Sequence, residues 1–94
     1  MINLSGTLKL HPQEVHDNNY DFISVEKYMT RGFQHEFGHE AHSIYAKALE
    51  LIASTYPNNA DRFQVFSYTS NGTTTKFWLI NDETHITALL PSEY

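Results

Sequence analysis

The sequence contains no cysteine, which excludes disulfide bonds, thiolate zinc sites and cysteine nucleophiles. Long apolar runs are also missing, since no stretch approaches the roughly 20 residues that a membrane-spanning helix needs. Residues 1–6 have neither the basic region nor the apolar stretch of a secretory signal. We therefore expect a cytoplasmic protein that folds without disulfides and has no membrane partner.

Basic residues are scarce as well. Six lysines and arginines stand against eleven acidic residues, which gives a formal net charge of −5. The six are spread along the chain, so the sequence predicts no basic stripe that could bind phosphates. We therefore expect no direct nucleic-acid binding, whereas an acidic surface suits a protein partner with basic groups.

Aromatic residues, in contrast, are abundant, with six Phe, six Tyr and one Trp. A chain of 94 residues has room for one domain, and this aromatic content is enough for one hydrophobic core. We therefore expect a single domain over residues 1–94.

The first part of the chain predicts one strand and one ambiguous element. Residues 2–10 alternate between apolar and polar side chains, which is typical of a half-buried strand, and Pro12 ends the pattern. Gly6 within this strand indicates a bulge or a close backbone approach. Residues 22–29 fit a strand or a short helix, and both interpretations remain open.

The middle of the chain predicts a long helix. Thr30 is a suitable N-cap, and apolar side chains then recur in steps of three and four from Phe33 to Leu51. The pattern continues to the Tyr56-Pro57 sequence, which stops it. The sequence therefore predicts a helix over residues 31–55 with one apolar stripe that packs on a sheet.

The last third of the chain predicts a three-stranded antiparallel meander. Residues 62–69 and 73–80 flank Asn71-Gly72, which is the strongest short-range signal for a type I′ hairpin. Residues 85–90 form the third strand. The predicted class is α+β: one long helix on an antiparallel sheet that consists of this meander and the N-terminal strand at its edge.

The hairpin turn fixes which side chains share a face of the sheet. With Asn71-Gly72 as the loop, the alternation of side chains predicts two apolar faces. One face carries Phe66, Tyr68, Phe77 and Leu79. The other carries Phe63, Val65, Trp78 and Ile80. One helix covers only one face, so either the N-terminal half of the chain or a second molecule must cover the other.

The predicted helix contains a motif with metal chemistry. The sequence His35-Glu36-Phe37-Gly38-His39 fits the pattern His-Glu-x-x-His, in which two histidines four residues apart on a helix can bind one Zn²⁺. It resembles the motif of the zincin metallopeptidases. That resemblance implies His35 and His39 as zinc ligands and Glu36 as the general base. His85 or Glu83, at the start of the last strand, could complete the ligand set.

The same histidines also belong to a longer spacing pattern. One flank of the helix carries residues in alternating steps of four and three, with small side chains at Ala46 and Ala53: His35, His39, His42, Ala46, Leu49 and Ala53. Heptad spacing of this kind is typical of a helix–helix contact. The flank could therefore form a homodimer seam, with histidine protonation near pH 6 opposing the contact. A part-exposed helix flank with no partner is the alternative.

Taken together, these patterns predict a small acidic, non-catalytic protein-binding domain that inhibits or regulates its partner and forms a homodimer, without a cofactor. Small size and acidity are shared by many inhibitory proteins of phages and bacteria, as an analogy only. The predicted binding residues are Trp78, Phe63, Val65, Ile80, Leu49 and His42. The alternative function is a zinc-dependent hydrolase with Glu36 as the catalytic residue and His35, His39 and His85 as metal ligands.

Overall fold

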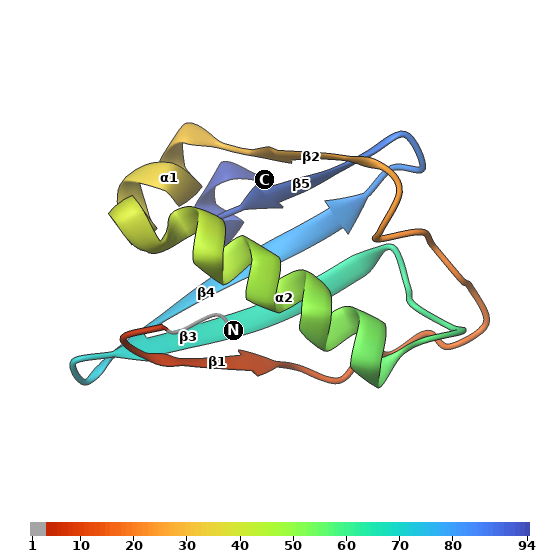
Figure 1. Cartoon of the computed structure of the whole chain (residues 1–94), viewed down its shortest axis with the longest axis horizontal. Helices are drawn as coiled ribbons and strands as arrows, with labels where there is room; N and C mark the ends of the chain where they lie inside the picture. Colours follow the sequence, from red (N-terminus) through yellow and green to blue (C-terminus); the bar gives the residue numbers. More distant parts are fainter. Residues whose placement is uncertain (1–3) are drawn as a thin grey trace.

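The computed structural model describes residues 4–94 and shows helices packed on one face of a five-stranded sheet (Figure 1). The strand order is β1-β3-β4-β5-β2, and all neighbours are antiparallel except β2 and β5. The α+β class is confirmed. The elements are β1 (Thr7–Leu10), β2 (Glu26–Met29), α1 (Arg31–Phe37), η1 (Gly38–Glu40), α2 (Ala41–Thr55), β3 (Phe63–Ser70), β4 (Thr73–Asn81), β5 (His85–Leu89) and η2 (Pro91–Glu93).

The β3–β4 hairpin has the predicted turn and register. Asn71 and Gly72 have φ angles of 52° and 77°, the positive values that a type I′ turn requires at both central positions. The register pairs Phe66 with Phe77 and Val65 with Trp78, as predicted from the turn. The predicted hairpin and the predicted antiparallel meander of β3, β4 and β5 are therefore both confirmed.

The N-terminal strand joins an edge of the sheet, as predicted, and the structure shows that it pairs with β3. It begins at Thr7 rather than at residue 2, and residues 1–3 lie outside the described part of the chain. Gly6 marks a close approach, because a Cβ at this position would lie 2.3 Å from the backbone oxygen of Thr69. Only glycine lets the chain enter the sheet edge here.

The ambiguous segment 22–29 contains a short strand, β2, which lies parallel to β5 at the other edge of the sheet. The segment does not form a short helix, because the Asp21 carboxylate accepts hydrogen bonds from the backbone N–H groups of Ile23 and Ser24 and closes a turn before β2. The sheet therefore has one strand more than the four predicted.

The helical segment spans residues 31–55 as predicted, but it is interrupted. Thr30 is the N-cap, and its hydroxyl accepts a hydrogen bond from the N–H of Phe33 at 3.1 Å. Gly38 then adopts φ 55° and ψ −131°, a conformation that glycine tolerates and other residues rarely adopt. The chain changes direction there, and α2 begins at Ala41.

The core lies between the helices and the inner face of the sheet. The rings of Phe66 and Phe77 stack with centroids 5.1 Å apart and planes 7° apart, and Phe33 packs edge-on to Phe77 at 5.2 Å. These three rings are fully buried, as are the aliphatic side chains Ile44, Ile52, Leu79 and Ile86. The helices thus cover the face on which the sequence placed Phe66, Tyr68, Phe77 and Leu79.

Candidate functional site

The face of the sheet opposite the helices is the candidate site, and we name it the open face. Its centre consists of the side chains predicted to share it: Phe63, Val65, Trp78 and Ile80. All four are half-buried, whereas the side chains that alternate with them along β3 and β4 are buried under the helices. The structure therefore brings together four of the six predicted binding residues.

The N-terminal half of the chain does not cover the open face. Strands β1 and β2 lie in the sheet itself, one at each edge. The loop over residues 11–15 reaches only one corner, where it borders a cavity of about 340 Å³ together with Phe63 and Val65. The sequence left open whether the N-terminal half of the chain or a second molecule covers this face. Within residues 4–94, the N-terminal half does not cover it.

Tyr94 adds an aromatic ring to the open face that the sequence analysis missed. Its ring packs edge-on against Trp78, with centroids 5.4 Å apart, and lies 6.5 Å from Phe63. Tyr94 is nevertheless 77% exposed, so it extends the aromatic cluster rather than burying it. Tyr94 comes after Pro91, where the alternating pattern of the last strand has ended, so no periodicity in the sequence could have placed its ring on the sheet.

Glu93 holds the turn that positions Tyr94. Its carboxylate accepts hydrogen bonds from the Thr30 hydroxyl at 2.6 Å, the Leu90 N–H at 2.9 Å and the Gly32 N–H at 3.1 Å. The bond from Thr30, followed by the two backbone bonds, holds the pKa of Glu93 below its usual value. The start of α1 and the end of the chain are thereby tied together.

A polar row borders the aromatic cluster on one side. The register of β1, β3 and β4 aligns Lys9, Ser67 and Lys76 across the sheet on the open face. The His11 ring nitrogen Nε2 lies 2.5 Å from Ser67 Oγ. Lys9 and Lys76, two of the six basic residues, therefore lie beside the apolar centre. Their proximity depends on which strands pair, so it could not be predicted from the sequence.

The His11–Ser67 pair does not form a nucleophilic site. Ser67 lies in the middle of β3, a strand paired on both sides, so its own N–H and C=O belong to the sheet ladders. Within residues 4–94, no carboxylate is hydrogen-bonded to His11 to orient it as a base. A serine nucleophile needs such an orienting group and free N–H donors for the oxyanion.

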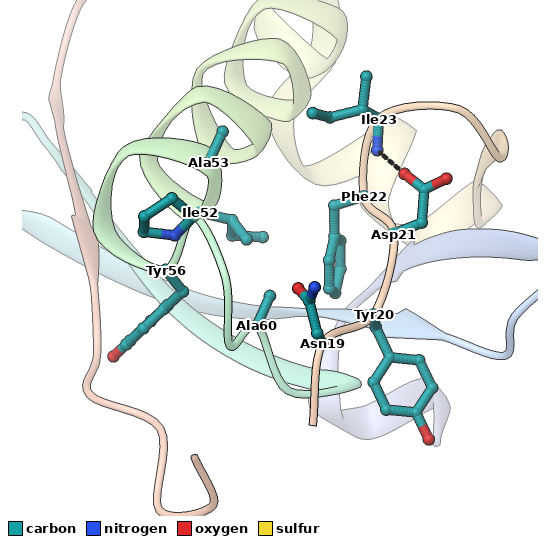
Figure 2. Close-up of a pocket in the computed structure, with 10 residues that line it drawn as sticks. Asn19, Tyr20, Asp21, Phe22, Ile23, Ile52, Ala53, Tyr56 and Ala60 are labelled. Atoms are coloured by element: carbon teal, nitrogen blue, oxygen red, sulfur yellow. Dashed lines mark hydrogen bonds between the residues drawn. The ribbon is translucent and has the colours of Figure 1, made fainter. Parts of the chain in front are cut away.

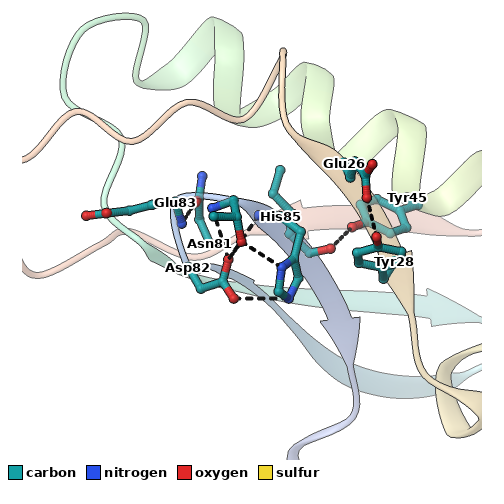
Figure 3. Close-up of polar contacts among 9 residues, drawn as sticks. Glu26, Tyr28, Tyr45, Asn81, Asp82, Glu83 and His85 are labelled. Atoms are coloured by element: carbon teal, nitrogen blue, oxygen red, sulfur yellow. Dashed lines mark hydrogen bonds and ion pairs between the residues drawn. The ribbon is translucent and has the colours of Figure 1, made fainter.

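An acidic and aromatic group borders the opposite end of the open face (Figure 3). The Asp82 carboxylate lies 3.0 Å from His85 Nε2, and the Tyr28 ring packs edge-on to His85 at 5.1 Å. Burial raises the pKa of Asp82, but hydrogen bonds from His85 and Thr84 outweigh it and leave that pKa below its usual value. The hydrogen bond that Tyr28 donates to Glu26 raises the pKa of the tyrosine.

The His-Glu-x-x-His motif requires two histidines one turn apart on the same helix, and residues 35–39 do not have this geometry. Gly38 breaks the helix between His35 and His39, so these exposed side chains are not one turn apart on a continuous helix. Glu36 lies near Thr75, with 3.4 Å between Oε2 and Oγ1. Over the described residues 4–94, no three His, Asp or Glu side chains come close enough to hold a metal ion.

His85, the proposed third zinc ligand, lies far from this segment. It begins β5 and points to the open face, since its neighbour Ile86 is buried under the helices. Strand β2 is parallel to β5 and leads into α1, so α1 lies beyond the opposite end of β5. The structure therefore does not bring His85 to His35 and His39, and zinc binding stays an untested prediction.

Leu49 and His42, the other two predicted binding residues, lie on the helical side of the molecule. Both are on α2 and line a cavity of about 420 Å³ between that helix and β2. They are therefore separated by the sheet from Trp78 and the rest of the open face.

The chain matches no protein-family model, no curated protein and no solved structure. Neither helix in the part of the chain that the structure describes has the length and apolar character needed to cross a membrane. The function must therefore be argued from the surfaces themselves.

Proposed function

We propose that the protein is a non-catalytic protein-binding domain, which inhibits or regulates another protein by holding it against the open face. The observation that carries the proposal is the half-buried aromatic and aliphatic centre of that face, around Trp78 and Phe63, with Tyr94 exposed above it. Trp and Tyr are the residues most enriched among the energetic hot spots of protein interfaces.

The arrangement of polar groups supports a protein partner. The apolar centre has Lys9 and Lys76 on one side and Asp82 with Glu26 on the other. A hydrophobic centre with a polar rim is the usual anatomy of a protein interface. Complementarity would place acidic groups of the partner against the two lysines and basic groups against the carboxylates.

The size of the open face suits a small specific interface. The five strands have 4, 4, 8, 9 and 5 residues, and at about 3.3 Å along the strand and 4.8 Å between strands for each residue they give an area of roughly 480 Å². A standard interface buries about 800 Å² on each partner. The sheet, together with Tyr94 and the loop at residues 11–15, therefore approaches the size of a standard interface.

Site-specific photo-crosslinking tests this proposal. A photoreactive amino acid replaces Val65 on the open face, and in a matched variant it replaces Glu50, which is exposed on α2. In cells of the source organism, the proposal predicts a defined crosslinked protein from position 65 that position 50 does not yield. The additional substitution Trp78→Ala should abolish this crosslink, whereas Glu36→Gln should leave it unchanged.

The opposite pattern would support the alternative function. A zinc-dependent hydrolase with His35 and His39 as ligands would lose its activity with Glu36→Gln and keep it with Trp78→Ala. No crosslinked protein from position 65, or the same crosslinked protein from positions 65 and 50, would remove the open face as the binding surface.

A further inference from the structure

One end of the open face offers a place for a negative charge. Lys9, Ser67 and Lys76 form a row across β1, β3 and β4 with their side chains on this face, and we name it the basic row. Because neighbouring strands lie about 4.8 Å apart, the Cα atoms of the two lysines are about 10 Å apart, with Ser67 midway between them. Lysine side chains are long enough for both ammonium groups to reach a group that lies above the serine.

Both lysines of the basic row are exposed, and neither is neutralised within the described chain. Over residues 4–94, the ion pairs are those of Lys47 with Glu50 and of His85 with Asp82. The two lysines of the row therefore face each other across one strand without a carboxylate between them. On a chain of net charge −5, such a pair of cations attracts an anionic group of a ligand.

Ser67 forms the floor of the basic row. It is 8% exposed, and its Oγ lies 2.5 Å from the ring nitrogen Nε2 of His11. When Nε2 carries the proton, it donates to Oγ, and the hydroxyl hydrogen of Ser67 is then available to an acceptor above the row. The row thus presents two ammonium groups and one hydroxyl donor to the same point.

These donors suit a carboxylate better than a phosphate. A carboxylate has two oxygens and one negative charge, so each oxygen can face one ammonium group. Phosphate sites typically add arginine forks or free backbone N–H groups, whereas Ser67 lies in a strand that is paired on both sides. A nucleic acid would in addition bring many phosphates against a chain of net charge −5.

An apolar position lies directly beside the basic row. Val65 and Trp78 pair with each other two residues along β3 and β4, about 7 Å from the row on the same face, and Phe63 with Ile80 follows at the same spacing. An extended segment repeats its side chains at this spacing too, and it packs on a sheet with its direction close to that of the strands. A carboxylate above Ser67 therefore places the side chain two residues away over Trp78.

A second copy of the chain is a poor source of this carboxylate. Asp82 on the open face already has partners: its Oδ2 lies 3.0 Å from His85 Nε2, and its Oδ1 accepts hydrogen bonds from the N–H groups of Thr84 and His85. The Glu26 carboxylate accepts a hydrogen bond from the Tyr28 hydroxyl. Binding to the lysines of another copy would compete with these contacts, which favours a different protein as the partner.

A cavity on the helical side of the sheet has the opposite character (Figure 2). It has a volume of about 390 Å³ and lies beside Ile52 and Ala53. Among the described residues that line it, Asp21 is the charged one, and its carboxylate accepts a hydrogen bond from the Ile23 N–H. The negative charge of Asp21 repels an anion there, so charge complementarity directs an acidic segment to the open face.

We propose that the open face binds an extended acidic segment of its protein partner. An Asp or Glu carboxylate of that segment lies between Lys9 and Lys76 above Ser67, and a large apolar side chain two residues away packs on Trp78. This inference rests on the proposed function, because it gives the chemistry of the segment that the open face holds. The two lysines fix the position of the segment along the strands, and Trp78 provides the central apolar contact.

Short peptides test this inference without knowledge of the partner. The probe is acetyl-Thr-Glu-Thr-Leu-Thr-Leu-Thr-amide, in which the threonines favour an extended chain and the glutamate and leucines alternate with them. Nuclear magnetic resonance of the nitrogen-15-labelled full chain follows the titration. We expect the backbone amide signals over residues 63–67 and 76–80 to shift. Replacement of Glu by Gln in the peptide should weaken binding roughly tenfold, because two ion pairs are lost.

Lysine variants then locate the carboxylate. Lys9→Gln and Lys76→Gln should each weaken binding of the Glu peptide and leave binding of the Gln peptide unchanged. Lys47→Gln removes an exposed lysine of α2, is the matched control and should affect neither peptide. Trp78→Ala should weaken binding of both peptides. Since all three lysines are exposed, their variants should keep the amide spectrum of the folded protein outside the substituted positions.

Three results would overturn the inference. The first is equal affinity of the Glu and Gln peptides, or no binding of either. The second is a phosphoserine peptide or a single-stranded oligonucleotide that binds through Lys9 and Lys76 more tightly than the Glu peptide, which would assign the row to phosphoryl groups. The third is a particle of twice the chain mass of 10.9 kDa in light scattering that the Glu peptide dissociates, which would assign the open face to a second copy.

The photo-crosslink from position 65 separates a failure of this inference from a failure of the proposed function. A crosslinked protein whose yield is unchanged when Lys9→Gln and Lys76→Gln are combined would overturn the acidic segment and leave the open face as the binding surface. A crosslink that this double variant abolishes and Lys47→Gln preserves would support the acidic segment. The absence of any crosslinked protein from position 65 would overturn the proposed function, and the inference with it.

Discussion

The rings of Trp78 and Tyr94 pack edge to face on the open side of the sheet, with 5.4 Å between their centroids. Trp78 comes from the central strand β4, and Tyr94 follows the turn η2 that Glu93 ties to the start of α1. The most exposed ring of the cluster is thus fixed by the same contacts that fix the fold. An interface that contains it is preorganised, which lowers the entropic cost of binding.

Substitutions on the two faces of β4 should differ in their effect on stability. Phe77→Ala removes a fully buried ring and should lower the free energy of unfolding by about 3–5 kcal/mol. Trp78→Ala removes a half-buried ring from the open face and should cost about 1–2 kcal/mol, because part of that ring is already hydrated in the folded state. Urea unfolding of both variants measures the difference. Equal losses would mean that the open face is covered.

Gly38→Ala should destabilise the fold by about 1–3 kcal/mol, because alanine is strained at φ 55° and ψ −131°. No atom lies within 4 Å of the Cβ that the substitution adds, so the cost is one of backbone conformation and not of a clash. Thermal or urea unfolding measures it. A semisynthetic protein with D-alanine at this position is the control and should unfold like the wild type; an L-alanine variant of unchanged stability would show that the helix is continuous.

The Glu93 carboxylate should make stability depend on pH in the acidic range. Its pKa in the folded protein is lower than in the unfolded chain, so its contribution is present above the unfolded value of about 4.5 and is lost as the pH falls through the folded value. Glu93→Gln should therefore lower the melting temperature at pH 7 and have less effect at strongly acidic pH. Glu50→Gln, which removes only an exposed ion pair with Lys47 at 3.8 Å, should change little at either pH. A pH-independent loss in Glu93→Gln would exclude the charge as the cause.

Zinc should not copurify in a fixed ratio with the chain, because the break at Gly38 separates the two histidines that would share the ion. Elemental analysis before and after dialysis against a chelator measures the metal content. One zinc per chain that His39→Ala removes would contradict this expectation and favour the hydrolase. His16→Ala, a change of an exposed histidine outside the motif, is the matched control.

The hairpin could be predicted because its information is local. The two residues Asn71-Gly72 determine the turn, the turn determines the register, and the register places Trp78 and Phe77 on opposite faces. The helix N-cap at Thr30 is local in the same sense. Four of the predicted binding residues followed from this reasoning, and the structure places them together.

The remaining features depend on contacts between distant parts of the chain. Strand β2 has the sequence Glu-Lys-Tyr-Met, which lacks an apolar alternation, and it is a strand because it pairs with β5 almost 60 residues later. The apolar periodicity continues across Gly38, so only the observed φ angle reveals the break. Likewise, the alignment of Lys9 with Lys76 requires knowledge of which strands pair.

The affinity of the crosslinked partner for three forms of the protein tests the central claim most directly. Once photo-crosslinking from position 65 has identified the partner, titration calorimetry compares the wild type with Trp78→Ala and Glu36→Gln. The open face as the binding surface predicts a loss of at least about 30-fold for Trp78→Ala, the effect of a hot-spot residue of about 2 kcal/mol, and no change for Glu36→Gln. Unchanged affinity in Trp78→Ala would contradict the account, and a loss confined to Glu36→Gln would move the function to the helical motif.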